Sequence, residues 1–249
     1  MIKHFNIEAI KKARNGIKIA PGGFRYGYIP DLFNEDSYRE LVRTFPDVTK
    51  FKLVDKQSGG GRKRFCVGPN YYSGLTWGCI CHMQNLPEIW REVLHESADT
   101  QLIDLLQDVT DVPFNSLCNF GFTYGNEGCM QEAHIDGAVR QGDPGPIYST
   151  MASILYFNEQ PDPVGGTCVY APDRTTILAQ APHLRNGFFF FEQHPDAWHG
   201  FPVMPAGAER HIVSLSYSQE RVPIELKKSF FHRTTCTYRL RDALRSILR

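Results

Sequence analysis

The segment Phe-Asn-Ser-Leu-Cys-Asn-Phe-Gly-Phe-Thr-Tyr, residues 114–124, marks the point where the hydrophobic pattern of this chain changes from helical to β-type. Short runs rich in β-branched and aromatic residues follow, with turn residues between them. The runs occupy residues 114–124, 129–137, 148–158, 164–171, 174–180, 187–193, 198–204 and 210–218. About eight strands at this spacing predict a closed or double-sheet β core.

Helical patterns flank this β region. Apolar residues recur at helical spacing between residues 34 and 46, across residues 87–109 and again across residues 238–248, whereas residues 24–29 are strand-like. We therefore expect a mainly β protein with flanking helices (α+β) that forms one structural domain. Its expected parts are an N-terminal extension at residues 1–113 whose helices pack on the core, the β core at 114–218, and a tail with a helix at 219–249.

The composition is that of a soluble globular protein without a strong net charge. The chain has 249 residues, 42% of them hydrophobic, and its 27 Lys and Arg balance 27 Asp and Glu. We therefore expect no general attraction to nucleic acid or to an anionic membrane. The chain has no apolar run of about 18 residues that would predict a membrane span. Its seven scattered cysteines indicate reduced thiols and a cytoplasmic protein. The oligomeric state is not readable from the sequence.

The motif His134-Ile135-Asp136 is the first candidate for chemistry. On a strand, residues two apart point to the same face, so both polar side chains can meet one ion. Two imidazoles and one carboxylate can occupy one face of a ferrous ion and leave its other positions open. A solvated, purely structural strand end is the alternative interpretation of this motif alone.

A second histidine has to come from a distant strand. The downstream histidines are His183, His194, His199 and His211. We favour His199, because it follows an apolar run within a β-type segment. His194 precedes a proline in an expected loop and is the main rival.

Arg210 opens the last β-type run and is a candidate anchor for the far carboxylate of an oxoacid, which an arginine binds through paired hydrogen bonds. Strand alternation places Ser214 on the same face, where it can add a hydrogen bond. An exposed edge arginine and a plain packed serine are the alternative interpretations.

Taken together, these elements resemble the iron(II)- and 2-oxoglutarate-dependent dioxygenases, and within them the prolyl 4-hydroxylase-like branch. The resemblance covers residues 114–218 and rests on an ordered set of motifs. They are the segment 149–159 with its Leu-Tyr-Phe-Asn, the turn Gly165-Gly166-Thr167, Asn186-Gly187 before four phenylalanines, and His199-Gly200-Phe201-Pro202-Val203 with Gly207 and Arg210.

The resemblance implies a double-stranded β-helix, or jelly roll, with iron between its two sheets. It implies His134, Asp136 and His199 as metal ligands and catalytic residues, and Arg210 as the anchor of the 2-oxoglutarate co-substrate. It further implies Fe(II) as cofactor and O2 as oxidant. Tyr124 stands where family members often place a tyrosine near the co-substrate, and a core aromatic is the alternative for this residue.

Two features of the motifs narrow the expected chemistry. Collagen-type prolyl hydroxylases have a lysine at the anchor position where this chain has Arg210, which argues against a collagen-like substrate. Related halogenases lack the carboxylate that Asp136 supplies here, so hydroxylation is expected. The turn at Gly165 is one residue shorter than the family pattern.

Basic and aromatic residues near the expected site are candidates for substrate binding. The Gly59-Gly60-Gly61 segment is a candidate lid, with a solvated loop as the alternative. The candidate substrate residues are Arg62, Arg64, Arg140, Arg174 and Trp198.

We expect a dioxygenase that hydroxylates an unactivated C–H bond of a small amino-acid-like or natural-product substrate. A prolyl or peptidyl hydroxylase acting on a protein is one alternative. Others are a cupin-like metal enzyme without oxoglutarate and a non-catalytic jelly-roll binding module.

Overall fold

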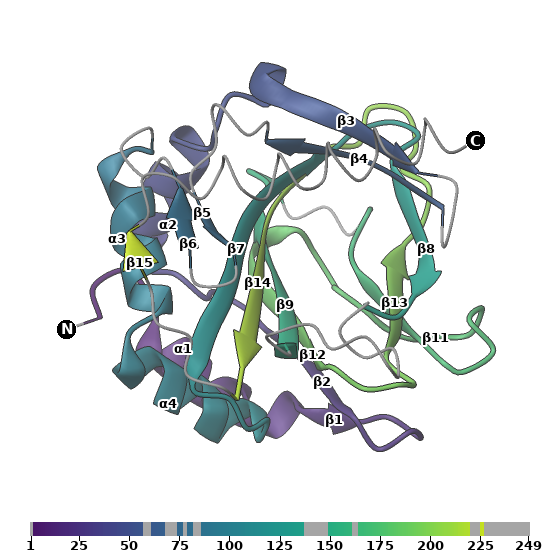
Figure 1. The fold of residues 1–249 in the computed structure, drawn as a ribbon, viewed down its shortest axis with the longest axis horizontal. Helices are drawn as coiled ribbons and strands as arrows, with labels where there is room; N and C mark the ends of the chain where they lie inside the picture. Colours follow the sequence, from purple (N-terminus) through teal and green to yellow (C-terminus); the bar gives the residue numbers. More distant parts are fainter. Residues whose placement is uncertain are drawn as a thin grey trace, which may run out of the picture.

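The computed structural model describes residues 2–56, 61–67, 74–76, 79–81, 86–136, 149–160, 164–219 and 225–226. Its strands form one curled sheet that wraps around an interior, and four helices lie on one side of it (Figure 1). No helix within these ranges combines the length and the apolar character needed to cross a membrane.

The main path of the sheet has neighbours that are all antiparallel. Its order is β1 (Lys18–Ile19), β2 (Arg25–Ile29), β12 (Arg185–Glu192), β9 (Ser149–Phe157), β14 (Arg210–Ser218), β7 (Ser116–Gly125), β4 (Arg62–Val67), β8 (Met130–His134), β13 (Trp198–Phe201), β10 (Cys168–Tyr170) and β11 (Ile177–Gln180). Strand β4 pairs with both β7 and β8, so it joins the two halves of the curl.

Four short strands lie off this path. Strand β3 (Phe51–Lys56) forms a hairpin with β4, and β5 (Gly74–Thr76) pairs with β7. Strand β6 (Cys79–Cys81) pairs with β5 and, in parallel, with β15 (Glu225–Leu226). Strands β5, β6 and β15 therefore extend the sheet beside β7.

The helices are α1 (Ile7–Lys12), α2 (Glu35–Arg43), α3 (Glu88–Ser97) and α4 (Thr100–Thr110), with 3-10 turns at Ala13–Gly16 and Val48–Lys50. The single helix expected over residues 87–109 is two helices. Asp99 separates them, since its side chain accepts a hydrogen bond from the backbone N–H of Gln101 and so caps the start of α4.

The four phenylalanines of β12 show how the sheet divides the core. Phe188 and Phe190 join the cluster that packs against the helices, whereas Phe189 and Phe191 join a second cluster inside the curl. A strand buried on both faces needs apolar residues at every position, which explains the unbroken run. We call the helix-covered side the outer face of the sheet and the other side the inner face.

The same alternation sorts the central strand β14. Val213 and Leu215 lie in the outer cluster and Ile212 lies in the inner one. Arg210 is two residues before Ile212 and therefore starts the strand on the inner face. The inner face of the sheet, which forms the floor of the curl, is thus apolar and carries a cation, Arg210, at one end.

Each of the eight expected β runs between residues 114 and 218 overlaps one of the strands β7 to β14, so the predicted mainly β jelly-roll core is confirmed. The expected strand at 24–29 is β2. The N-terminal extension contributes more than helices, because β2 pairs with β12 and the residues directly after the candidate lid form β4. Gly59 and Gly60 of the candidate lid and the expected helix at 238–248 lie outside the described residues.

Candidate metal centre

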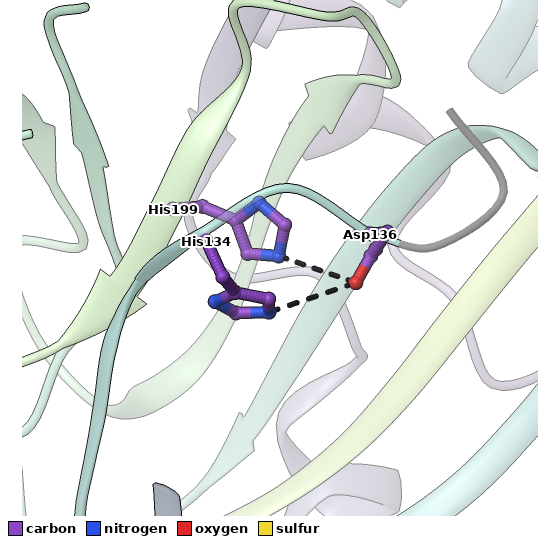
Figure 2. Close-up of side chains that lie close together, drawn as sticks. All are labelled: His134, Asp136 and His199. Carbon is purple, nitrogen blue, oxygen red and sulfur yellow. Dashed lines mark ion pairs between the residues drawn. The ribbon is translucent and has the colours of Figure 1, made fainter. Parts of the chain in front are cut away.

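Strand pairing brings the two histidines of the expected ligand set side by side. His134 ends β8 and is the direct cross-strand partner of His199 in β13. Their ring centroids are 4.2 Å apart. Asp136 follows two residues after His134, and Figure 2 shows its carboxylate facing both rings. One ligand atom from each of the three residues lies within 4.8 Å of the others.

The distances between these donor atoms suit a single cation. The Oδ1 atom of Asp136 is 3.6 Å from Nε2 of His134 and 3.5 Å from Nε2 of His199. Neighbouring ligands of an octahedral ion, each about 2.1 Å from it, are about 3 Å apart. A contraction of about half an ångström would therefore bring Oδ1 of Asp136 and each histidine Nε2 to that separation. Placed around one ion, the three donors would leave its other positions open.

Backbone carbonyls fix which nitrogen each ring presents. Nδ1 of His134 lies 2.9 Å from the carbonyl oxygen of Glu132, and Nδ1 of His199 lies 3.0 Å from that of Ala197. A carbonyl only accepts, so each Nδ1 carries the proton and donates it. When a ring is neutral its lone pair is therefore on Nε2, the nitrogen nearer to Asp136, which is the tautomer a metal requires.

The carboxylate of Asp136 is held ionised and oriented. Burial alone would raise the pKa of Asp136, but the charge that His199 carries when protonated, the hydrogen bonds that His134 and His199 donate in that form, and the hydrogen bond from Gln193 outweigh it and hold the pKa well below its usual range. The side-chain amide of Gln193 donates to Oδ2 over 2.6 Å. Oδ1 is therefore the oxygen left for a cation.

Arg210 lies on the same inner face and is almost completely buried. Its Nη2 donates to the hydroxyl of Thr167 over 2.8 Å, and its guanidinium lies 4.3 Å from the ring centre of Phe201. Burial lowers the pKa of Arg210. Its Nε is buried and has no hydrogen-bond partner among the described residues. A buried guanidinium with an unused donor is suited to bind an anion.

Tyr156 completes the surroundings of this cation. It is the cross-strand partner of Ile212, and its hydroxyl accepts a hydrogen bond from the backbone N–H of Thr167 over 3.0 Å. Burial raises the pKa of Tyr156, so its hydroxyl stays protonated and can donate.

From the sequence, Tyr156 was considered only as a possible wall of the site, and Thr167 and Gln193 were missed as site residues. For Tyr156 the signal was present, because alternation along 149–157 places it with Ile154 on the inner face. Gln193 had no such signal. It lies just beyond β12, and its position depends on how the sheet curls.

Ser214 lies where its strand position predicted. It is half-buried on the inner face of β14, and its partner across the β9 ladder is Ile154. Ile154 in turn pairs with Phe189, two residues before Phe191, whose ring contacts His199 with a centroid separation of 4.2 Å. Ser214 is therefore on the floor between Arg210 and the histidines.

Tyr124 does not lie on the inner face beside Arg210, where it was expected. It pairs with His211, so its ring lies on the outer face, opposite to Arg210. There its hydroxyl donates to Glu209 over 3.0 Å, and its ring contacts Phe65. Strand alternation turns Tyr124 away from the His–Asp–His group, and its place in the helix-side cluster is that of a core aromatic.

The structure places the candidate substrate residues in different surroundings. The guanidinium of Arg174, in an exposed turn, stacks 3.9 Å above the ring of Trp198, and Trp198 lies on the opposite face of β13 from its neighbour His199. These two residues therefore contact each other and not the ligand group. Arg64 lies in β4, and Arg62 pairs through its backbone with Gln131. Arg140 lies outside the described residues.

Comparison with known proteins identifies the fold. No family model matches the sequence, and no curated protein resembles it at the sequence level. Solved structures do match. A prolyl-4-hydroxylase from Pseudomonas putida superposes with a TM-score of 0.55 at 15% identity, over 85% of this chain and 99% of that one.

Two further structures show how varied the proteins with this fold are. A prolyl hydroxylase from Trichoplax adhaerens, in complex with a peptide fragment of the hypoxia inducible factor oxygen degradation domain, has a TM-score of 0.55 at 14% identity, over 86% of this chain and 92% of that one. The non-heme alpha ketoglutarate dependent epimerase SnoN from nogalamycin biosynthesis has a TM-score of 0.55 at 10% identity, over 86% and 80%. The fold expected from the resemblance is therefore confirmed, and identities this low establish nothing beyond the fold.

Proposed function

We propose that this protein is an iron(II)- and 2-oxoglutarate-dependent dioxygenase that hydroxylates an unactivated C–H bond. The observation that carries the proposal is the convergence of His134, Asp136 and His199 within 4.8 Å, inside a fold shared with such oxygenases. A buried arginine with an unused donor on the same inner face supports it.

The three ligands would hold Fe(II) through Nε2 of each histidine and Oδ1 of Asp136, leaving half of an octahedral shell for co-substrate and oxygen. The bound iron and 2-oxoglutarate together supply the oxidising power, with O2 as oxidant and succinate and carbon dioxide as products. Gln193 and the two backbone carbonyls orient the ligands, which is the support a metal site requires.

Arg210 would bind the far carboxylate of 2-oxoglutarate. Its Nε is unused, and the hydroxyls of Thr167 and Tyr156 lie beside it. An anion in this place satisfies a buried cation that otherwise costs free energy. Ser214, between Arg210 and the histidines on the inner face, would contact the rest of the co-substrate, and Phe189 and Phe191 would exclude water from this space.

For the second substrate we propose a small amino-acid-like or natural-product molecule. Support comes from the basic strand β4, whose Arg62 pairs through its backbone with Gln131 in the strand that carries His134. A basic residue beside the site suits a small carboxylate. Proteins with this fold include both a peptide-bound hydroxylase and an enzyme of nogalamycin biosynthesis, so a peptidyl substrate is the alternative that an experiment must separate.

A coupled succinate assay tests the proposal. Purified protein with Fe(II), ascorbate, 2-oxoglutarate and air is mixed with pools of amino acids, peptides and biosynthetic intermediates, and succinate and products are measured. We expect 2-oxoglutarate-dependent succinate and a product 16 mass units heavier than its substrate, the mass of one added oxygen atom. His199→Ala should abolish both, whereas His194→Ala should retain them, since His194 contacts Phe24 and not the ligand group.

The alternatives give different results. Turnover that needs Fe(II) but not 2-oxoglutarate would indicate a cupin-like metal enzyme. Failure to bind Fe(II) at all would indicate a non-catalytic binding module, and the oxygenase proposal would be withdrawn. Product found only on intact proteins or peptides would contradict the small-molecule part and leave the rest standing.

A further inference from the structure

Arg64 lies at the corner where the sheet turns from one half of the curl to the other. Phe65 pairs with Tyr124 of β7, and Lys63 already pairs with Met130 of β8. The ring of Phe65 contacts that of Tyr124 on the outer face, with centroids 5.8 Å apart. Alternation therefore directs Arg64 to the inner face, between the two strands.

The register places Arg64 in one row with Arg210. Arg210 pairs with Gly125 of β7, and the step from Tyr124 to Gly125 matches the step from Phe65 to Arg64 in the antiparallel pair. Gly125 is therefore the residue between the two arginines. A Cβ atom on Gly125 would lie 3.7 Å from that of Arg210 and 3.1 Å from Sδ of Met204. The side chain of Met204 therefore occupies the space that a side chain at position 125 would take.

Both guanidinium groups have an unused donor. The Nε atoms of Arg64 and Arg210 are buried and have no hydrogen-bond partner within the described part of the chain. None of the ion pairs found there includes either residue. Burial first, and then the charge of Arg64, lower the pKa of Arg210, so the two cations are close enough to repel. Two such cations are stable together when an anion lies between them.

We propose that Arg64 is a second co-substrate-binding residue, which shares with Arg210 the far carboxylate of 2-oxoglutarate. This inference rests on the proposed function. A carboxylate has two oxygens with about four acceptor positions, so it can receive hydrogen bonds from both guanidinium groups. Because Arg64 and Arg210 lie on either side of Gly125, both can reach one carboxylate. This position favours binding of the co-substrate over binding of the second substrate.

Calorimetric titration of Mn(II)-loaded protein tests the proposal without turnover. The probes are 2-oxoglutarate and 2-oxopentanoate, which has the same chain length but no far carboxylate. The variants are Arg64→Met, Arg64→Lys and, as the matched control, Arg174→Met, which removes an exposed arginine that contacts Trp198. Affinity for Mn(II) is measured on each variant and reports whether the ligand group is intact.

We expect Arg64→Met to weaken 2-oxoglutarate binding at least about tenfold, the usual loss for a charge-assisted hydrogen bond. Its affinities for 2-oxopentanoate and Mn(II) should stay within about twofold of the parent protein. Arg64→Lys should restore part of the loss, and Arg174→Met should change nothing.

Other results overturn the proposal. Unchanged 2-oxoglutarate affinity in Arg64→Met would refute it, including the case where only the KM of the second substrate rises. Equal losses for both probes would show a structural effect and also refute it. If the parent protein binds Mn(II) but neither probe, the proposed function itself fails, which is a distinct result.

Discussion

At the scale of single residues, two glutamines contact the ligand group, which consists of His134, Asp136 and His199. Gln193 donates to Oδ2 of Asp136, whereas the amide of Gln131 lies 2.9 Å from Nε2 of His134, the atom that a metal would take. The first glutamine therefore orients a ligand, and the second one competes with the ion. The two amides contact different members of the same group and have opposite consequences.

Gln193→Leu should weaken metal binding about tenfold, the lower end of the effect of removing a partner that orients a ligand. Gln131→Leu should leave the metal affinity unchanged or raise it, because the departing amide no longer competes for His134. Titration of each protein with Mn(II) or Fe(II) under anaerobic conditions measures both. A loss in Gln131→Leu as large as that in Gln193→Leu would contradict this assignment.

Asp173 provides a pH prediction away from the metal. The hydroxyl of Thr176 and the backbone N–H groups of Thr176 and Thr175 donate to its carboxylate and lower its pKa to about 2. Because the folded pKa is depressed, this contribution to stability is fully present above the ordinary carboxyl pKa and is lost as the pH falls through about 2.

Carbon-13 NMR titration of the Asp173 carboxyl group measures that pKa. Asp36, on the exposed side of α2, serves as the comparison within the same spectra. A midpoint for Asp173 near the ordinary carboxyl value would contradict the hydrogen bonds that define this turn.

At the scale of elements, the distance between β8 and β13 decides whether the histidines converge. Their pairing is irregular between His199 and Phe201, and Gly200 lies at that point. A Cβ atom on Gly200 would fall against the backbone carbonyls of Gln131 and Glu132. No flexible side chain is available to yield there, so the strands approach closely only because this residue is glycine.

Gly200→Ala should separate the two strands and lower the metal affinity about tenfold or more, comparable to the loss of an orienting contact. It should also destabilise the fold by about 1–3 kcal/mol, the usual cost of overpacking. Gly16→Ala is the control, since a Cβ atom there would meet nothing within 4 Å. Urea denaturation and metal titration measure the two effects. Equal metal affinity in both variants would show that the spacing of β8 and β13 is not limiting.

The elements also show what sequence alone could predict. The runs between residues 114 and 218 gave β7 to β14, because period-two and continuous apolar patterns depend on local burial. The position of Arg210 on the inner face followed from alternation in the same way. The break at Asp99 was missed because an aspartate inside a helical pattern reads equally as a surface residue or as a cap.

Other site features depended on pairing between distant strands. Tyr124 was expected beside the co-substrate, but only the register with His211 reveals that it faces outward. Arg64 and Arg210 are far apart in sequence and come together through β4 and β7, which no local pattern predicts. The hairpin of β3 and β4 was missed for the same reason, because the glycine-rich segment between them indicated a loop.

At the scale of the whole molecule, the N-terminal third and the β core depend on each other. Phe188 to Phe191 of β12 pair with Tyr26 to Ile29 of β2, and Figure 1 shows the helices covering one side of β7 and β14. Trp90 of α3 is completely buried against Phe122 and Phe157. The outer cluster is therefore shared between residues before and after position 113.

We therefore propose that residues 1–113 are part of one folding unit and predict that a fragment of residues 114–249 does not fold alone. Without β2 and the helices it would expose Phe188 and Phe190 and leave a long sheet edge unpaired, which favours aggregation. Near-UV circular dichroism and size-exclusion chromatography compare the fragment with the full chain. Adding a separately produced fragment of residues 1–113 should restore the near-UV signal and Mn(II) binding. The opposite result would be a fragment of residues 114–249 that is monomeric, unfolds cooperatively and binds Mn(II) by itself. It would show that the β core folds without the N-terminal extension.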